Sequence, residues 1–492
     1  MACQFTVAED MEVFVPAGSA QQEPLTLGLE DGGSVEVRPS FPLDDLSGPA
    51  LGVACDIGTT TVAAHLLDLR TGMRLAASAA ANPQACHGAD VISRIEYGST
   101  DPGLRELQML AVSCVKGLIA DLCERAGTDR GAIREVCVVG NTTMNHLFLG
   151  LPVRQLGQAP YAAFSLDAHD VPAAGLGIAV HPCARIHAVE NIAGFVGGDT
   201  TAVAVAVHIG RAAKATLVLD IGTNGELLLA AGGRVYAASC AAGPAFEGAR
   251  IAQGSRAVAG AIDHVEAARA DIRISVLGGG EPRTICGSGL IDAVSAMLSL
   301  GVLDTTGRLV SRTRMPAGLA GPVAERILDL SGQPAFCLAW DRNGRQPLVA
   351  LTQADLRETQ LAKAAIRAGV ELLLARIGLR AADLGHVLLA GAFGATVRAA
   401  GAVRIGLLPD VPLDRVRSIG NAACAGAERI LLNTDCRAEA GELARSIEYV
   451  EIARDPAFGE AFASAMAFPP AGGDGLGVPQ TTRYDGSRRG TD

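Results

Sequence analysis

Residues 55–68 read CDIGTTTVAAHLLD, and residues 219–231 read LDIGTNGELLLAA. The tetrapeptide Asp-Ile-Gly-Thr occurs in both, 164 positions apart (220 minus 56), and each time it lies between two apolar runs. Two apolar runs around a short polar turn predict a β-hairpin. A repeat within one chain predicts a duplicated unit, so we expect two similar lobes that each present such a hairpin.

The composition limits the kinds of partner that this chain can have. The 492 residues are too many for one ordinary domain, and 49 % of them are hydrophobic, which is enough for a large interior. The net charge is −11 and no stretch is rich in Lys and Arg, so we expect no nucleic acid and no membrane among the main partners. A small molecule or a protein is favoured.

Neither the N-terminal sequence nor the cysteine spacing indicates export. The first residues, MACQFTVAEDMEVF, lack the basic and apolar regions of a signal peptide, and no apolar run is long enough to cross a bilayer. The 12 cysteines never form a C-x-x-C pair and mostly lie in apolar runs, which is typical of small core residues. We therefore expect a cytoplasmic protein.

Strands alternate with helices along most of the chain, which predicts an α/β fold with parallel strands. We expect helices over roughly residues 102–126 and 355–376, the second of them amphipathic. The predicted division is a short β-rich N-terminal arm (1–50), a first lobe (51–195), a second lobe (196–468) and a disordered tail rich in Gly and Pro (469–492).

The repeated turn has the residue types that bind phosphate. Glycine lets backbone N–H groups converge on an anion, and threonine hydroxyls add donors. The carboxylates of Asp56 and Asp220, at the strand ends, can hold Mg²⁺ through water or orient an attacking water, so we assign both as metal-binding and catalytic candidates. The predicted phosphate-binding residues are Gly58, Thr59, Thr60, Thr61, Gly222, Thr223, Asn224 and Gly225.

Other polar and glycine positions each have a functional and a structural interpretation. Asn141 and Thr142 can face a cleft or cap the helix that follows them. Glu247, the third catalytic candidate, can orient water or contact a ribose, or it can pair with Arg250 at the surface. A lone histidine, His146, is expected in the core.

Two glycine-containing turns complete the candidate site. Gly287 and Ser288, before a helix, can bind an anion or cap that helix. Gly391, Phe393 and Gly394, after a buried strand, can admit adenine and ribose or simply pack strand against helix.

The two hairpins, together with LAGAFG (389–394), resemble the phosphate-1, phosphate-2 and adenosine motifs of the acetate and sugar kinase, Hsp70 and actin (ASKHA) superfamily. This resemblance implies a two-lobed, duplicated actin/hexokinase-like (ribonuclease H-like) ATPase fold that binds ATP and Mg²⁺.

Further blocks are similar to the reductive activators of corrinoid proteins, and the resemblance covers roughly residues 51–450. It implies that ATP hydrolysis drives reduction of cob(II)alamin to cob(I)alamin in a corrinoid protein of a methyltransferase system. It also implies nucleotide-binding roles for Gly420 and Asn421 within SIGNAACAGA. The blocks are NPQACHGADVISRI (82–95), VVGNTTMNH (138–146), CAAGPAFEGARI (240–251), ICGSGLIDA (285–293), TQLAKAAIRAG (359–369) and SIGNAACAGA (418–427).

The N-terminus departs from this family pattern. The family carries an N-terminal [2Fe–2S] ferredoxin-like domain, whereas here MACQ is preceded by no C-x₄-C-x₂-C run. We therefore expect no iron–sulfur cluster in this chain and electrons from a separate iron–sulfur protein or a missing domain. A homodimer is left open. The competing interpretations are a small-molecule kinase with the same phosphate clamp and an ATP-gated, chaperone-like protein.

Overall fold

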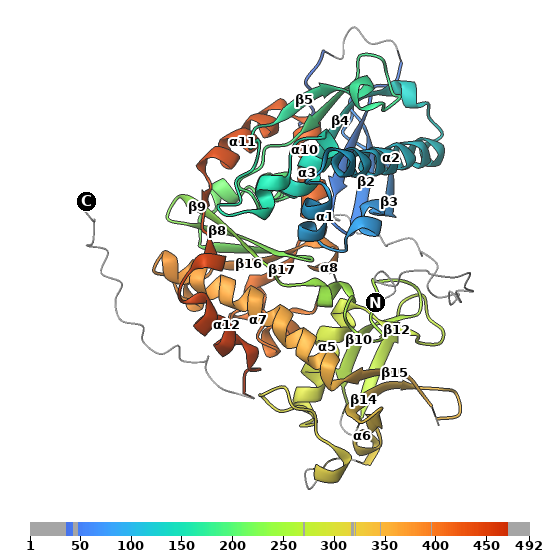
Figure 1. Cartoon of the computed structure of the whole chain (residues 1–492), viewed down its shortest axis with the longest axis vertical. Helices are drawn as coiled ribbons and strands as arrows, with labels where there is room; N and C mark the ends of the chain where they lie inside the picture. The colour runs from blue at the N-terminus through green and yellow to red at the C-terminus, as the bar shows by residue number, and fades with distance from the viewer. Residues whose placement is uncertain are drawn as a thin grey trace, which may run out of the picture.

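A computed structural model describes residues 36–42, 48–268, 271–315, 319, 321–344, 346–394 and 396–470. Most of the predicted N-terminal arm, with Cys3, and most of the predicted C-terminal tail lie outside the described residues, as does the side chain of Phe393. Figure 1 shows two lobes stacked along the long axis of the molecule, with the N-terminal half of the chain in the upper one.

The first lobe is built on a six-stranded sheet with the order β3-β2-β1-β4-β6-β5. β1 pairs antiparallel with β2 and parallel with β4, which in turn is parallel to β6. The strands are β1 (Leu51–Ile57), β2 (Thr61–Asp68), β3 (Arg74–Ala81), β4 (Ile133–Gly140), β5 (His169–Pro172) and β6 (Arg185–Ala188).

The second lobe has the order β17-β16-β7-β8-β9-β18 and repeats five strands of the first sheet, whereas its sixth strand, β18, lies beside β9 at the other edge. Three antiparallel strands from consecutive hairpins are again followed by two parallel strands, so β7 corresponds to β1 and β16 to β4. The predicted duplication and fold class are confirmed. The strands are β7 (Thr216–Ile221), β8 (Gly225–Ala231), β9 (Arg234–Cys240), β16 (His386–Ala390), β17 (Val416–Ser418) and β18 (Glu448–Tyr449).

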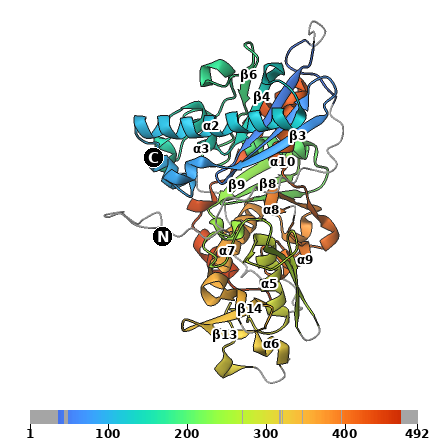
Figure 2. The ribbon, with the colours of Figure 1, turned by 90° about the vertical axis from the view of Figure 1, so that its right-hand side faces the viewer.

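Helices cover both faces of each sheet. The outer face of the first sheet packs against α1 (Val91–Tyr97), α2 (Asp101–Ala126) and α3 (Thr142–Leu149), and that of the second against α7 (Gln353–Arg376). Figure 2 shows α2 lying across the strands of the upper sheet. The two helices predicted from the sequence are confirmed as α2 and α7.

A third layer of helices lies between the two sheets. It contains α4 (Gly198–Ala206), α10 (Ala422–Leu432) and α11 (Thr434–Ser446), which share one hydrophobic cluster with the inner faces of both sheets. α4 and α10 cross so closely that a Cβ on Gly426 would lie 1.9 Å from the Ala202 carbonyl oxygen. The division at residue 195 stays a prediction, because α10 and α11, late in the chain, pack on the first sheet as well as on the second.

The second lobe also carries a large insertion between β9 and α7, at the lower end of Figure 1. Two three-stranded sheets form it, with the orders β11-β10-β12 and β13-β14-β15. Its elements are β10 (Ala261–Ala267), β11 (Ile272–Val276), β12 (Thr284–Ile285), α5 (Gly287–Ser299), α6 (Gly321–Glu325), β13 (Ile327–Leu330), β14 (Gln333–Trp340) and β15 (Pro347–Thr352). The remaining helices are α8 (Gly391–Gly394), α9 (Ala399–Arg404) and α12 (Phe458–Met466).

The two-residue period of a strand determines where the candidate carboxylates point. On β1, Val53 and Cys55 belong to the outer cluster, whereas Ala54 belongs to the middle one. Because side chains alternate, Asp56 shares the face of Ala54, toward the helices between the sheets. The same reasoning on β7 turns Asp220 toward that layer. In the part of the chain that is described, no helix has the length and apolarity to span a membrane.

Candidate active site

The turns of the two hairpins meet at the junction of the lobes. The Thr60 Oγ1 atom of the first turn lies 3.5 Å from the Thr223 Oγ1 atom of the second. The Glu247 carboxylate accepts a hydrogen bond from each hydroxyl, at 2.7 Å from Thr60 and 2.8 Å from Thr223. Glu247 ends the short 3₁₀ helix η8 (Pro244–Glu247), so one acidic side chain bridges both turns.

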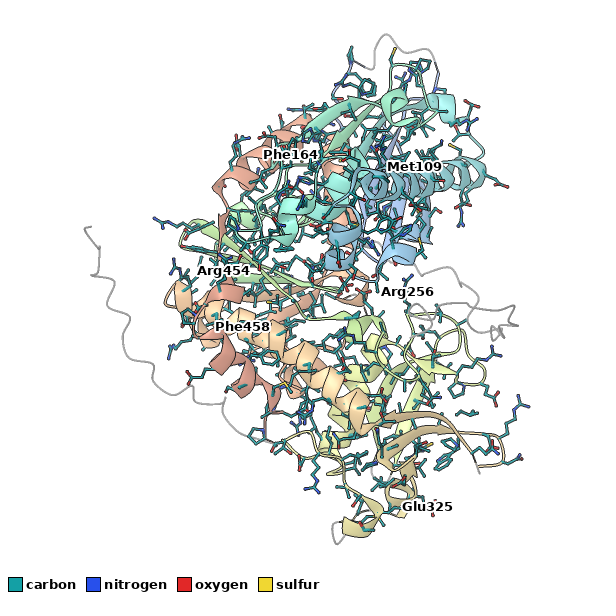
Figure 3. All side chains as sticks on the ribbon, in the orientation of Figure 1. Met109, Phe164, Arg256, Glu325, Arg454 and Phe458 are labelled. Atoms are coloured by element: carbon teal, nitrogen blue, oxygen red, sulfur yellow. The ribbon has the colours of Figure 1, made fainter. Side chains whose placement is uncertain are left out.

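A cation completes this bridge. The Arg256 Nη2 atom donates to the Thr60 carbonyl oxygen at 3.2 Å, and Arg256 lies at the junction of the lobes in Figure 3. Burial lowers the pKa of Arg256, and the nearby Glu247 charge opposes this shift. Arg250, the alternative partner of Glu247 considered above, instead faces Glu358 at 3.9 Å. The carboxylate of Glu247 thus bonds to the two turns, whereas Arg250 lies near a different carboxylate.

Asparagines hold the first turn in place. The Asn82 side chain donates to the Gly58 carbonyl at 2.8 Å, and its backbone N–H donates to the Thr60 carbonyl at 2.9 Å. Asn141 donates to Thr59 Oγ1 at 3.0 Å and also accepts from the backbone N–H of Met144 at the start of α3. Asn141 thus caps α3, one of the two roles considered from the sequence, and it also contacts the first turn.

Four carboxyl groups gather beside the turns. Asp56 and Asp220 are joined by Asp199, near the start of α4, and by Glu226, which pairs with Asp220 across β7 and β8. Burial and the neighbouring negative charges of Asp199 and Asp220 raise the pKa of Asp56 to about 8. Burial raises the pKa of Asp199 to about 6, and burial and the charge of Asp199 raise the pKa of Asp220 to about 7.

The same causes raise the pKa of Glu226 well above its usual value. Asp56, Asp220 and Glu226 have pKa values raised by burial and by neighbouring carboxylates, and Asp199 by burial, so the four form a site with excess negative charge, which a divalent cation would relieve. The described residues contain no set of three His, Cys, Asp or Glu side chains close enough to ligate a metal directly. The residues therefore fit Mg²⁺ held partly through water and phosphate oxygens, which is its usual mode.

The glycine turn after β16 lies directly against one of these acids. Gly391 has φ +84°, and a Cβ at this position would lie 2.6 Å from Asp220 Oδ1. Asn421, which caps the start of α10, is close enough to Asp56 to counteract part of the rise in its pKa. Gly420 precedes it with φ +58°. Gly391 and Asn421 thus connect the helical layer and the second sheet to the two aspartates.

The structure does not bring every candidate to the turns. Thr142 is buried and donates to the Ala193 carbonyl at 2.6 Å, and Ser288 is buried and donates to the Asp263 carbonyl at 2.9 Å. Gly225 closes the second turn by pairing with Ile221, but its α-carbon faces Ile366 of α7. His146 is in the core, as expected, with its Nδ1 atom 2.7 Å from the Thr142 carbonyl oxygen.

Comparison with protein families identifies this arrangement. Residues 214–475 match the model of the C-terminal domain of RACo, the ASKHA domain, and residues 51–212 match that of the RACo middle region. The chain belongs to the RACo family. The two matched regions of this RACo-family chain meet between α4 and β7, where the duplicated sheet begins for the second time.

Named proteins and a solved structure agree with this assignment. The corrinoid activation enzyme RamQ of Eubacterium limosum is 35% identical over 425 residues, covering 86% of this chain and 71% of RamQ. A [Co(II) methylated amine-specific corrinoid protein] reductase of Methanosarcina barkeri is 25% identical over 427 residues, covering 80% of this chain and 72% of the reductase. A solved reductive activator for corrinoid, iron-sulfur protein superposes with TM-score 0.78 and 36% identity, covering 87% of this chain and 67% of that one.

Several residues near the turns were not assigned from the sequence of this RACo-family chain. Asp199 follows two glycines at the start of α4, just as Asn421 follows Gly420 at the start of α10. This similarity between the starts of the two helices is the sequence signal that could have identified Asp199 as a candidate. Glu226 stands in the quoted stretch LDIGTNGE, but a strand position gave no reason to choose it. Asn82 lies in a block that was identified only by resemblance, so its contact with the first turn was not predicted.

Proposed function

We propose that this chain is a Mg²⁺-dependent ATPase that reductively activates a corrinoid protein. Hydrolysis of ATP to ADP and phosphate accompanies transfer of one electron from a low-potential iron–sulfur centre to cob(II)alamin, which becomes cob(I)alamin. The corrinoid is the substrate and belongs to the partner protein. The family assignment and the names of the relatives support this reaction.

The observation that carries the ATPase part is the junction of the two turns at Thr60, Thr223 and Glu247. Two equivalent hairpins, one from each lobe, direct hydroxyl groups toward a single point. A polyphosphate bound there would contact both lobes, so its binding energy would favour their closed arrangement. The glycine turn at Gly391 is the proposed place of the adenosine, next to Asp220.

The chain's own residues would hold and polarise the reacting groups. Asp56 and Asp220 are the proposed holders of Mg²⁺, whose charge would offset that of the phosphates and polarise them toward attack. Glu247 is the proposed acceptor of a proton from the attacking water, once a phosphate has replaced it on the two threonine hydroxyls. Asn141 and Asn82 keep the first turn in its binding conformation.

The coupling to reduction is proposed to pass through closure of the lobes. If the corrinoid protein binds a surface whose shape depends on closure, ATP changes the affinity for that protein, and the protein changes the affinity for ATP by the same factor. The affinity for the corrinoid protein and the affinity for ATP can each be measured in the presence and absence of the other ligand.

The decisive experiment mixes the chain with ATP, Mg²⁺, a low-potential reductant and a cob(II)alamin protein, and follows the visible spectrum. We expect cob(I)alamin to form only with ATP and in proportion to the phosphate released. Phosphate release with no change of the corrinoid spectrum across a panel of corrinoid proteins would refute the activator function. Transfer of phosphate to a small hydroxyl or carboxyl compound would instead establish the kinase alternative.

A further inference from the structure

The most unusual charged residue of the first lobe is Arg94, at the end of the block NPQACHGADVISRI. Arg94 is fully buried, with an exposed fraction of 0%, and it is among the largest side chains that are completely covered. Arginine side chains are almost never buried to this extent without a carboxylate partner, because the charge loses its hydration. The role of this buried charge therefore requires an explanation.

The bonds of Arg94 all go to neutral groups. Its Nε atom donates to the Gly88 carbonyl oxygen at 2.9 Å, and its Nη1 atom lies 3.4 Å from Gln84 Oε1 and 3.4 Å from Met144 Sδ. Its Nη2 atom is buried and has no hydrogen-bond partner in the described part of the chain. The guanidinium is thus oriented at one end and carries an unused donor at the other.

The surroundings of Arg94 connect it to the first phosphate turn. Gln84 Oε1 also lies 3.4 Å from the Asn82 side-chain nitrogen, which donates to the Gly58 carbonyl of that turn. The negative charge of Asp90 acts on Arg94 most strongly among the neighbouring acidic groups, and that of Glu247, which bridges both turns, acts on it as well. Burial lowers the pKa of Arg94 to about 10, so the side chain keeps its positive charge near neutral pH.

We propose that Arg94 is a catalytic residue that binds the terminal phosphate of ATP through its free Nη2 donor. This assignment rests on the proposed ATPase function and adds a residue to it. A bound terminal phosphate would supply the negative charge that the guanidinium lacks, and further charge develops on that phosphate as its bond to the leaving oxygen breaks. Glu247 gives up its two threonine donors to the same phosphate.

This role predicts that Arg94 distinguishes ATP from ADP, because only ATP has the terminal phosphate. A buried, charge-assisted hydrogen bond corresponds to about 10- to 100-fold in affinity. Replacement Arg94→Gln should therefore weaken binding of a non-hydrolysable ATP analogue by about that factor, measured by calorimetry with Mg²⁺, and leave ADP affinity within about threefold. Arg94→Lys, which keeps the charge but lacks the forked donor, should lose about tenfold.

Two further variants separate this role from a structural one. Arg94→Met removes a buried charge that has no carboxylate partner, so the thermal midpoint should stay level or rise. Arg326→Gln is the matched control: Arg326 is also largely buried, but it forms a two-point ion pair with Asp271 in the insertion. Its replacement should lower the thermal midpoint and leave the ratio of ATP-analogue to ADP affinity unchanged.

The outcomes discriminate between the two proposals. A ratio of ATP-analogue to ADP affinity that is the same in wild type, R94Q and R94K would overturn the role of Arg94 while the ATPase function stands. A wild-type protein that binds neither nucleotide would overturn the ATPase function itself. A marked loss of stability in R94M, with an unchanged ratio in R94K, would assign Arg94 to the core instead.

Discussion

The two lobes share a five-stranded core sheet but differ in the position of the sixth strand and in what is attached to the sheet. Between the third strand and the covering helix, the first lobe has only the segment 82–100, whereas the second has the insertion 241–352 with two additional sheets. The common part places the two hairpin turns opposite each other. The different parts supply the side chains that make the two turns chemically unequal.

The turns themselves show this inequality. Around the first turn, a Cβ on Gly58 would lie 2.6 Å from the Thr61 carbonyl oxygen, and two asparagines bond to the turn. Around the second turn, a Cβ on Gly222 would have its nearest contact at 3.5 Å, with Glu247. The first turn is therefore packed closely within its own lobe, whereas the main contact of the second turn is with Glu247, at the start of the insertion.

The largest expected effect tests whether the two aspartates act equally. Asp56→Asn and Asp220→Asn each remove one carboxylate from the proposed Mg²⁺ site, and we expect phosphate release to fall by about 100-fold or more in both. Because burial and neighbouring carboxylates raise the pKa values of both aspartates, neither variant should lose stability. Phosphate release is measured with saturating ATP, and unfolding by calorimetric scanning.

An unequal result would sharpen the comparison, because a variant that keeps its activity would identify the lobe that does not hold the metal. Full activity in both variants would contradict the proposed clamp. Added Mg²⁺ should partly restore a variant that retains the other carboxylate, which separates lost metal binding from lost folding.

The second prediction concerns the helices that join the lobes. Gly426→Ala in α10 would force a Cβ to within 1.9 Å of the Ala202 carbonyl oxygen in α4 and should cost about 3 kcal/mol of unfolding free energy. Gly117→Ala, on α2, has no atom within 4 Å of the new Cβ and should stabilise by about 0.5–1 kcal/mol. Denaturant unfolding measures the stability of both variants. Equal changes in the two would mean that α4 and α10 can move apart to admit the new Cβ at little cost.

The sequence was sufficient for the repeated parts of the fold. The Asp-Ile-Gly-Thr repeat predicted two hairpins, and apolar periodicity predicted α2 and α7, since these signals are local. The insertion between β9 and α7 was not predicted as two separate sheets, because which of its strands pair with one another depends on tertiary packing and not on a local pattern.

The site was predictable only where chemistry and local pattern coincide. Thr60 and Thr223 were chosen because they stand in the turns, and the structure brings their hydroxyl groups together. Arg94 and Asp199 were not chosen, because their proximity to the turns arises from packing between segments far apart in the chain. A buried arginine within an otherwise ordinary helix gives no local signal.

The third prediction compares the glycines of the two turns. Gly58→Ala should cost about 1–2 kcal/mol and weaken ATP binding, since its Cβ would meet the Thr61 carbonyl oxygen. Gly222→Ala should change stability by less than about 0.5 kcal/mol, because ordinary van der Waals space is available. The stability of both is measured by urea titration; the reverse order would show that the second turn is the more constrained one.

The smallest expected effect concerns α2 and α7, the equivalent covering helices. The outer face of α2 is open to solvent and leaves Met109 64% exposed, whereas α7 is covered by α12. Lys363 of α7, 1% exposed, donates to the Ala465 carbonyl at 2.6 Å and to that of Ala467 at the end of α12. Burial lowers the pKa of Lys363 to about 7, with Arg367 adding to this shift and Glu371 opposing it.

The sign of the pH effect follows from this lowered pKa. Above pH 7 the folded protein has released the proton of Lys363, while the unfolded chain still binds it, so the contribution of Lys363 to stability increases with pH, opposite in sign to the contributions of Asp56 and Asp220. Between pH 7 and pH 8 the increase from this group is about 1 kcal/mol. Lys363→Met should remove that increase, whereas Lys116→Met, on the exposed face of α2, should leave it intact. Urea unfolding of the three proteins at both pH values measures the difference. If the increase of stability with pH is the same in Lys363→Met as in the wild type, the amine of Lys363 stays protonated in the folded protein. The contact between α7 and α12 would then be a charged one and not a neutral one.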